Sequence, residues 1–399
     1  MEIEEAVSLL KKSITPISGS EDISLTDAFG RLLFEDISAP IAVPPFPKSA
    51  MDGYAVLAED TSFASKENPA VLSVTGELFA GDWKEIPCKK NTAVRVMTGS
   101  PVPAGFDAVV MQEDTDYGEE KVRVYKAVRP FQNYCKEGED IQKGSIVLSK
   151  EKKLSRTEIG LLSSLGFSSV KVRAQARISV LCTGSELVLP SEKLSDGKIY
   201  SSIGSMLSCS IKNAGLSVSE EKLISDDEEK IRAALEHALE ISDMIITTGG
   251  ISVGKKDLLP NVLNHLGAKT LFSHVNIQPG TPTTACILKD KVILCLSGNP
   301  YAALANFDMY FYQAAAVLMQ SDSFVPQKTQ AVLCSDYTKV NKLRRLVRAR
   351  LQGNNVFLPV QNHASSVISN LIDCNCYIDV PAMTQISKGD TVTVFMMGV

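Results

Sequence analysis

Three glycine-bearing loops carry the clearest sign of chemistry in this sequence. They span residues 183–187, 247–254 and 296–300, and each follows an apolar run that we predict to be a buried strand. Adjacent glycines such as Gly249 and Gly250 let backbone N–H groups approach a ligand, and a helix N-terminus favours an anion. One such loop alone is more often a plain turn. Three at the edge of one sheet favour a phosphate-binding site.

Acidic residues flank these loops. Glu186 and Asp257 follow two of the glycine loops, where a carboxylate is suited to bind magnesium beside a phosphate. Asp226 and Asp227 lie at the start of a predicted helix, and capping on a solvated surface is the simpler interpretation for Asp227. The acids therefore point to a metal or phosphate function at the same edge.

Two further clusters of glycine, aspartate and proline lie nearer the N-terminus. One is the run Ser-Ala-Met-Asp-Gly-Tyr-Ala at residues 49–55, and the other spans residues 95–113. By composition alone both would be turns. They also present Asp52, Thr98 and Glu113, which suit a polar ligand. Residue types alone do not select the reaction.

An alternation of predicted strands and helices would position the three glycine loops. It runs from residue 177 to residue 320 and predicts a parallel sheet with helices on both faces. In such a sheet, ligands bind beyond the carboxyl ends of the strands. The predicted strands are 178–182, 218–224, 244–248, 283–288 and 292–296, and the predicted helices are 202–214, 225–239, 258–266 and 301–319.

The segments on either side of this alternation have a different residue pattern. Helical periodicity appears at residues 2–14, 25–34 and 155–165, with Gly166 ending the last helix. The stretch from Val71 to Val147 is β-rich and predicts an all-β insert, and a second β-rich segment follows Pro326. The chain therefore reads as a multidomain α/β protein.

Composition excludes several classes of protein. The chain has 399 residues with a formal net charge of −5, which gives no support to a nucleic-acid binder. No apolar run reaches the roughly 18 residues of a membrane span. Its nine cysteines and four histidines have neither disulfide-framework nor zinc-site spacing. With an acidic start rather than a secretory leader, these features predict a cytoplasmic protein.

Seven motifs in one order resemble the MoeA/gephyrin-E family over essentially the whole chain. Their number and spacing make the resemblance specific. They are residues 49–55, 95–113, Gly138-Glu-Asp140, 184–187, 249–254 with Asp257, Pro279-Gly280, and Gly298-Asn-Pro300.

The resemblance implies a fold of four parts. These are a discontinuous elongated N-terminal domain (1–40 and 141–176), the β-insert (41–140), a doubly wound molybdopterin-binding α/β domain (177–322) and a small C-terminal β-domain (323–399). It also implies an elongated homodimer, with the site between the α/β domain of one subunit and the β-insert of its partner. The family reaction inserts molybdate into adenylylated molybdopterin with Mg²⁺ and releases AMP.

The resemblance also assigns roles to residues. Those implied to handle the ligand's polar groups and the reaction are Asp52, Thr98, Asp140, Glu186, Asp226 and Asp257. Those implied to hold the pterin and its phosphate are Gly184, Gly249, Gly250, Ser252, Gly254, Pro279, Gly280, Ser297, Gly298 and Asn299. The metal ligands would be Glu186 and Asp257.

The pocket departs from the family pattern. His274, Gln278 and Thr281 stand where the family has lysines around Pro-Gly. Losing two or three charged contacts to an oxyanion would cost on the order of 4 kcal/mol, about a thousandfold in affinity. His274, if protonated, or an arginine would recover part of it. The arginines considered are Arg344, Arg345 and Arg348, and further departures are Ser185, residues 133–135 and residues 200–203.

Two functions remain open at this point. The first is an active molybdenum insertase with a rearranged anion pocket, which the retained acids favour. The second is a non-catalytic paralogue that binds molybdopterin or cofactor, or acts as a scaffold, which the absent lysines favour. A generic nucleotide-binding protein would not explain the motifs of the β-insert. The sequence does not distinguish molybdate from tungstate, which share shape and charge.

Overall fold

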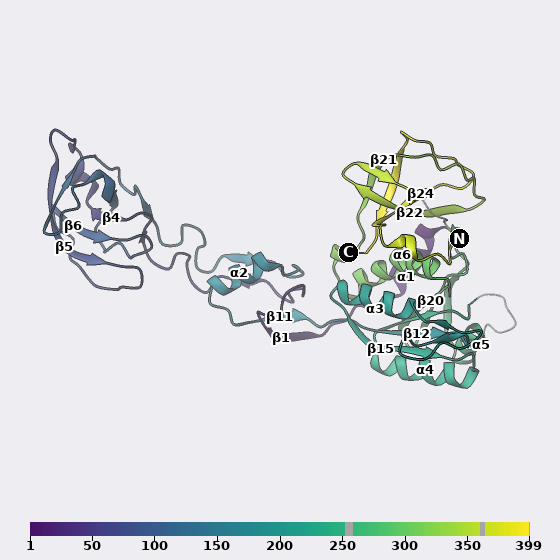
Figure 1. Cartoon of the computed structure of the whole chain (residues 1–399). Helices are drawn as coiled ribbons and strands as arrows, with labels where there is room; N and C mark the ends of the chain where they lie inside the picture. Colours follow the sequence, from purple (N-terminus) through teal and green to yellow (C-terminus); the bar gives the residue numbers. More distant parts are fainter. Residues whose placement is uncertain (252–257, 360–363, 399) are drawn as a thin grey trace. The chain divides into compact units, whose positions relative to one another are not determined.

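The chain divides into two compact units, which are described separately. The computed structural model describes residues 1–251, 258–359 and 364–398. The larger unit comprises Met1–Glu21 and Arg173–Val399, and the smaller unit comprises Asp22–Val172 (Figure 1). The four domain boundaries drawn from the sequence stay a prediction.

A six-stranded mixed sheet organises the larger unit. β12 pairs in parallel with β15 and β16, and β16 pairs in parallel with β20. β19 pairs antiparallel with both β20 and β17. The prediction of a parallel sheet is therefore right for the first four strands and wrong for the last two. In spatial order the strands are β15 (Ser217–Ile224), β12 (Arg177–Thr183), β16 (Met244–Thr248), β20 (Lys291–Leu296), β19 (Thr284–Leu288) and β17 (Lys269–Ser273).

A tight hairpin explains the reversal between β19 and β20. Lys289 and Asp290 connect them with φ values of 50° and 61°, the backbone geometry of a two-residue hairpin turn. Such a turn joins antiparallel neighbours, whereas parallel strands need a longer crossover. The strand–helix alternation predicted from the sequence therefore does not extend past α5 (Leu259–His265).

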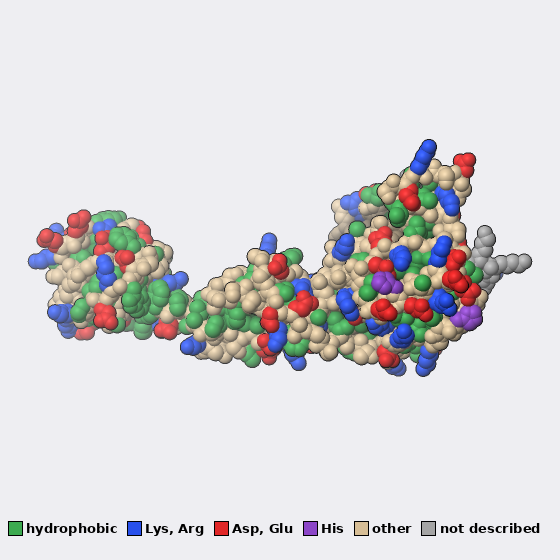
Figure 2. Space-filling view, turned by 90° about the horizontal axis from the view of Figure 1, so that it is seen from below, with side chains coloured by type: hydrophobic (Ala, Val, Ile, Leu, Met, Phe, Trp, Pro, Cys, Tyr) green, Lys and Arg blue, Asp and Glu red, His purple; other side chains and the backbone are tan. Residues whose placement is uncertain are grey.

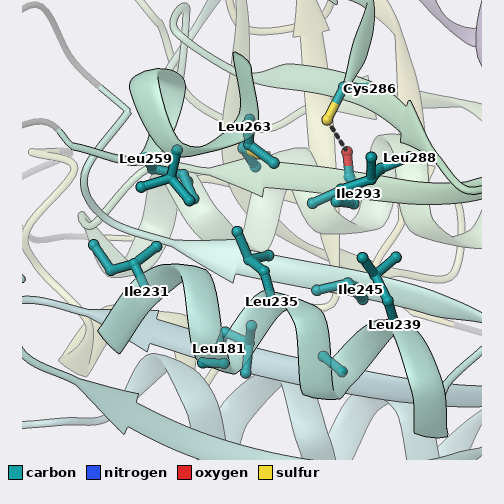
Figure 3. Close-up of a cluster of buried hydrophobic side chains, with 14 of the residues drawn as sticks. Leu181, Ile231, Leu235, Leu239, Ile245, Leu259, Leu263, Cys286, Leu288 and Ile293 are labelled. Atoms are coloured by element: carbon teal, nitrogen blue, oxygen red, sulfur yellow. Dashed lines mark hydrogen bonds between the residues drawn. The ribbon is translucent and has the colours of Figure 1, made fainter. Parts of the chain in front are cut away.

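One face of the sheet is covered by α5 and by α4 (Glu228–Ile241). Leu235 of α4, Leu263 of α5 and Ile245 of β16 belong to one buried apolar cluster (Figure 3). Asp227 caps α4 by accepting a hydrogen bond from the backbone N–H of Lys230, which satisfies one of the unpaired donors of the first turn.

The opposite face is covered by α3 (Ile203–Asn213) and α6 (Pro300–Leu318), as Figure 1 shows. α6 is apolar almost all round and buried along its length, as expected of a helix enclosed on every side. α1 (Ile3–Ser13) packs against α6 and β17. The prediction of helices on both faces is confirmed.

The C-terminal β-domain predicted from the sequence is confirmed as a small closed barrel. β24 pairs back onto β22 and closes the ring. β18 (Ile277–Gln278) comes from the α/β part and joins β22 in parallel. Around the ring the strands are β22 (Arg344–Gln352), β23 (Asn355–Phe357), β21 (Lys328–Leu333), β25 (Thr391–Met396) and β24 (Cys376–Val380).

The predicted all-β insert is confirmed as a five-stranded sheet in the smaller unit. Buried clusters lie on both of its faces, one around Tyr54 and Val110 and the other around Val94 and Val109. The strand order is β7 (Ala108–Met111), β4 (Gly53–Val56), β6 (Thr92–Val96), β5 (Ala70–Leu78) and β8 (Lys121–Val124).

Segments from either side of the insert pack together in the rest of the smaller unit. Ser155 is the N-cap residue of α2 and forms a capping box with Glu158. Leu33 and Leu162 share one buried cluster. The elements here are α2 (Arg156–Ser164) and the strand pairs β1 (Ser20–Ser24) with β11 (Ser169–Arg173) and β2 (Ile37–Ser38) with β10 (Ile146–Leu148).

The helix predicted at residues 25–34 is wrong. Gly30 has a φ of 77°, which interrupts any helical turn there. Leu32 and Leu33 instead form antiparallel bridges to Lys153 and Val172. The apolar residues of this segment are buried at turns and bridges, and their spacing happens to match a helical period.

Acidic and basic side chains are interspersed over the face of the larger unit that Figure 2 shows. A surface of mixed sign produces a weaker long-range field than a surface of one sign. Within the described parts of the chain, none of the helices combines the length and the apolar character that a membrane crossing requires.

A fully buried carboxyl links α6 to the barrel. The Tyr377 hydroxyl donates a 2.6 Å hydrogen bond to Asp308 Oδ2. Burial raises the pKa of Asp308 from its ordinary 3.8 to about 7, while the hydrogen bonds from Tyr377 and the Gly398 backbone oppose the shift. Asp308 Oδ1 has no hydrogen-bond partner among the described residues. The neutral acid is therefore the form that this site favours.

Asp308→Asn should make unfolding less dependent on pH. The folded-state pKa lies above the unfolded value, so the folded chain binds more protons and its stability falls as the pH rises through this window. Between pH 5 and pH 8 the wild type should lose about 2–3 kcal/mol of its free energy of unfolding because of this carboxyl, and the variant should not. Urea unfolding of both chains at the two pH values measures the difference. Identical pH dependence would show that the carboxyl is ionised in the fold.

Candidate active site

A cleft of about 1540 Å³ lies in the larger unit where the sheet meets the barrel. Its floor comes from the loops at the carboxyl ends of β12, β16 and β20, and its opposite wall comes from the barrel segments 339–345 and 364–365. The described parts of the three glycine loops therefore line one cleft, and their role as a binding site stays a prediction. The predicted site residues that line it are Gly184, Glu186, Asp226, Gly249, Gly250, Pro279, Gly280, Ser297, Gly298 and Asn299.

The floor is built from closely packed backbones, and at position 249 they leave no room for a side chain. A Cβ at position 249, where φ is 84°, would lie 2.3 Å from the carbonyl oxygen of Thr183. A Cβ at position 298 would lie 3.5 Å from the Cα of Gly249. The Gly249 N–H donates to the Leu296 carbonyl at 3.1 Å. These contacts hold the loops after β12, β16 and β20 at one edge, with a surface made largely of peptide groups.

The N-terminus of α6 opens at this edge. Pro300 occupies the first turn, where its missing N–H costs no helical hydrogen bond. Asn299 is the N-cap residue, and its side chain does not cap the helix. Its backbone N–H donates to Ser297 Oγ at 3.2 Å. The positive end of a long buried helix therefore lies at the cleft and favours an anion there.

A turn at Pro279–Gly280 is anchored to α6 by a buried amide. Asn306 Nδ2 donates to the Pro279 carbonyl at 2.9 Å and to the Ala302 carbonyl at 2.8 Å. A Cβ at position 280, where φ is 93°, would lie 1.8 Å from that Nδ2 atom. Only glycine fits this position while Asn306 keeps its hydrogen bonds.

Two acids, Glu186 and Asp226, come from the loops after β12 and β15, away from the N-terminus of α6. Both carboxylate oxygens of Glu186 lie 2.9 Å from the place of a Cβ on residue 184, so the carboxylate folds back over Gly184. Asp226 Oδ2 accepts from the Ser185 N–H at 2.9 Å, and Ser185 Oγ accepts from the Asp226 N–H at 3.0 Å. Burial raises the pKa of the Cys182 thiol, which also lines the cleft. The ionisable oxygens are therefore held in place and the sulfur is neutral.

The barrel wall is held to α6 by a buried arginine and a tyrosine. The Tyr301 hydroxyl donates to the Leu346 carbonyl at 2.7 Å and accepts from the Arg348 N–H at 2.9 Å. The Arg348 guanidinium lies 4.1 Å from the centre of the Tyr301 ring and donates to the carbonyls of Val367 and Ala364 at 2.6 and 2.9 Å. Burial lowers the pKa of Arg348. This contact fixes the strap that carries residues 364–365.

Of the three arginines considered from the sequence, Arg345 lines the cleft. Arg344 is instead bonded to Asp379 and Glu4, with each closest contact at 2.7 Å. Arg348 is buried as described above. Two lysines that sequence reasoning missed, Lys339 and Lys342, line the cleft beside Arg345.

The positions that lack the family lysines behave differently from one another. His274 is exposed and is not among the cleft-lining residues that the structure describes. Gln278 and Thr281 do line the cleft, and the Thr281 hydroxyl donates to the Ile277 carbonyl at 2.7 Å. Residues 200–203, another departure, also line it. The hypothesis that His274 supplies a replacement charge gains no support.

Three of the remaining predicted residues, Asp52, Thr98 and Asp140, belong to the smaller unit. Thr98 donates to Asp52 Oδ1 through both its N–H and its hydroxyl, each at 2.7 Å. These bonds, the backbone one first, lower the pKa of Asp52 and keep it ionised. Asp140 is exposed in a segment whose Gly138 N–H bonds to the Pro44 carbonyl. Ser252, Gly254 and Asp257 lie outside the described residues.

Sequence reasoning missed Asn306 as well as the two lysines. A signal for Asn306 existed, because it is a polar residue within an otherwise apolar predicted helix. Nothing local marked Lys339 or Lys342, since a pairing between distant strands brings them to the cleft.

Gly280→Ala should destabilise the larger unit far more than Gly267→Ala. Both glycines have positive φ, 93° and 79°, but a Cβ at position 267 meets nothing within 4 Å. The control should lose about 1 kcal/mol from backbone strain, and Gly280→Ala about 3 kcal/mol or more because Asn306 must move. Urea unfolding midpoints measure both. Equal losses would mean that the Asn306 contact is easily displaced.

Comparisons with known proteins cover nearly the whole chain. Family models match the MoeA N-terminal region (domain I and II) at residues 1–166, a probable molybdopterin binding domain at 179–316, and the MoeA C-terminal region (domain IV) at 330–396. A molybdopterin molybdenumtransferase from Bacillus subtilis (strain 168) is 37% identical over 386 residues, covering 95% of this chain and 90% of that protein. One from Staphylococcus epidermidis is 34% identical, covering 96% and 92%.

Solved structures agree. A molybdopterin biosynthesis moeA protein from Pyrococcus horikoshii matches with a TM-score of 0.87 at 29% identity, covering 100% of this chain and 99% of that one. A second structure from that organism gives 0.84 at 28% identity, covering 99% of each chain. The resemblance inferred from the seven motifs is confirmed. The chain belongs to the MoeA family, whose curated relatives are molybdopterin molybdenumtransferases.

Proposed function

We propose that this chain is a molybdopterin molybdenumtransferase that inserts molybdate into adenylylated molybdopterin and releases AMP. The observation that carries the proposal is the convergence of three glycine loops and the α6 N-terminus on one cleft, with Glu186 and Asp226 at its side. The names of relatives that are 37% and 34% identical over nearly the whole chain support the same reaction.

The floor suits the phosphate part of such a substrate. Adenylylated molybdopterin carries two linked phosphates, and a surface of peptide groups beside a helix N-terminus binds phosphate without protein charge. Close packing at Gly249 leaves no room for a side chain in that surface. The loops would bind the phosphates and leave the anhydride bond exposed to the acids.

Magnesium fits the donor groups on this side of the cleft. Mg²⁺ prefers oxygen ligands and commonly uses one or two carboxylates together with substrate phosphates and water. Glu186 would hold the ion, with Asp257 as the second ligand. When bound, the ion would neutralise phosphate charge and stabilise AMP as a leaving group.

We also propose a homodimer in which the partner's β-insert completes the site. The β-insert that carries the paired Asp52 and Thr98 also exposes apolar side chains: Met51, next to Asp52, is 40% exposed, and Trp83 is 70% exposed. Trp83 packs edge-on against Phe46 with ring centres 5.6 Å apart. Exposed aromatic and other apolar side chains are typical of a surface that another protein covers. Asp140 would join Asp52 and Thr98 there.

The reaction would take place in the cytoplasm. All nine cysteines are free thiols, which matches a reducing compartment.

Purified protein should release AMP from adenylylated molybdopterin when molybdate and Mg²⁺ are added. Glu186→Gln should slow release by about a hundredfold, because a carboxylate beside the reacting phosphates is lost. Glu229→Gln, an exposed change on α4, is the matched control and should have no effect. Tight binding without AMP release would point to the non-catalytic carrier. No binding at all would reject both.

Mixing two inactive variants tests the shared site. If the α/β domain of one subunit works with the β-insert of its partner, Glu186→Gln and Asp52→Asn impair different halves of each site. Random pairing then gives heterodimers with one intact site, and about a quarter of the wild-type rate should return. The rate of AMP release after mixing and subunit exchange measures this. No recovery, with exchange verified by mass, would contradict a site built from two subunits.

A further inference from the structure

The cleft has a cationic wall that comes from one short segment of the barrel. Lys339, Lys342 and Arg345 all line it, and all lie within seven residues of one another at and before the start of β22. The acids of the lining, Glu186 and Asp226, come from loops of the α/β sheet. Charges of opposite sign therefore occupy different walls.

Strand pairing places Arg345 beside the uncharged Pro-Gly loop. β18 runs parallel to β22, with Ile277 opposite Arg344 and Gln278 opposite Arg345. Paired residues of neighbouring strands project to the same side of a sheet. Gln278 leads directly into Pro279 and Gly280. A guanidinium from the barrel therefore accompanies the loop whose own side chains, Gln278 and Thr281, carry no charge.

The segment is anchored while its lysines stay available. Asn341 is buried, and its Oδ1 accepts from Arg345 Nη1 at 3.3 Å. Lys339 and Lys342 are exposed, and neither forms a salt bridge with another described residue. The adjacent Arg344, by contrast, is occupied by Asp379 and Glu4. Cations without a carboxylate partner at the edge of a cleft attract an anionic ligand.

We propose that the segment 339–345 is the oxyanion-binding wall of the cleft, with Arg345 as its principal contact. Its ligand is a tetrahedral oxyanion, either a substrate phosphate or the metal oxyanion. The planar guanidinium can donate two parallel hydrogen bonds to such a group, whereas the lysines add charge at the rim. The identity of the bound oxyanion rests on the proposed function, whereas the presence of an oxyanion site does not.

Calorimetric titration of the full-length protein tests this, with sodium molybdate in one arm and AMP in the other. Arg345→Gln should weaken binding of at least one oxyanion about tenfold or more, because a charged hydrogen bond is lost. Lys342→Gln is exposed, does not threaten the fold, and should weaken it about two- to fivefold, with a smaller effect at high salt. Arg350→Gln, an exposed change on the same strand, should have no effect.

The two arms identify the oxyanion. A loss confined to molybdate assigns the wall to the metal oxyanion, and a loss confined to AMP assigns it to phosphate. Wild-type affinity for both ligands in Arg345→Gln and Lys342→Gln would overturn the proposal, as would a wild-type protein that binds neither.

AMP release by the same proteins separates this inference from the proposed function. If the wild type turns over and both variants keep the wild-type oxyanion affinity, the proposed oxyanion-binding wall is wrong and the proposed function is retained. If the wild type does not turn over but Arg345→Gln lowers the oxyanion affinity, the oxyanion-binding wall is supported and the transferase function is rejected.

Discussion

At the carboxyl ends of β12 and β16, the Thr183 carbonyl oxygen lies 2.3 Å from the place that a Cβ of residue 249 would occupy. Together with the hydrogen bond from the Gly249 N–H to the Leu296 carbonyl, that approach brings the loops after β12, β16 and β20 together. It leaves a floor of peptide groups at the edge of the sheet, where open α/β folds bind ligands. The anchoring of Pro279–Gly280 by Asn306 depends on the same kind of close contact. Under the proposed function, phosphate recognition at this floor would depend more on backbone packing than on side-chain charge.

Charge is supplied from a different part of the chain. The barrel contributes Lys339, Lys342 and Arg345, and the pairing of β18 with β22 fixes where they stand relative to the glycine floor. Tyr301 and Arg348 secure the same barrel to α6. A Pro-Gly loop without lysines is therefore compatible with an anion site, because a neighbouring strand carries the cation. This favours the insertase over a paralogue that has lost its pocket.

Structural features that depend on neighbouring residues could be predicted from the sequence, whereas contacts between distant residues could not. The glycine loops, the all-β insert and the helices on both sheet faces follow from turn chemistry and periodicity, which act over a few residues. The strand β17 was not predicted, and β19 was predicted as a strand but was placed in a parallel sheet, although the two-residue turn at Lys289 and Asp290 favours an antiparallel pair. The false helix at residues 25–34 shows that apolar spacing alone is ambiguous. Arg345 reaches Gln278 across a gap of more than sixty residues, and no local pattern encodes that contact.

The most direct test is to locate the oxyanions in crystals of the full-length protein grown with AMP, molybdate and Mg²⁺. Anomalous scattering identifies molybdenum, and difference density identifies the phosphate. The account predicts that phosphate lies against the peptide groups at Gly249 and Gly298, with an oxyanion within hydrogen-bond distance of Arg345. Both ligands bound outside the cleft, with the glycine floor and Arg345 untouched, would contradict it.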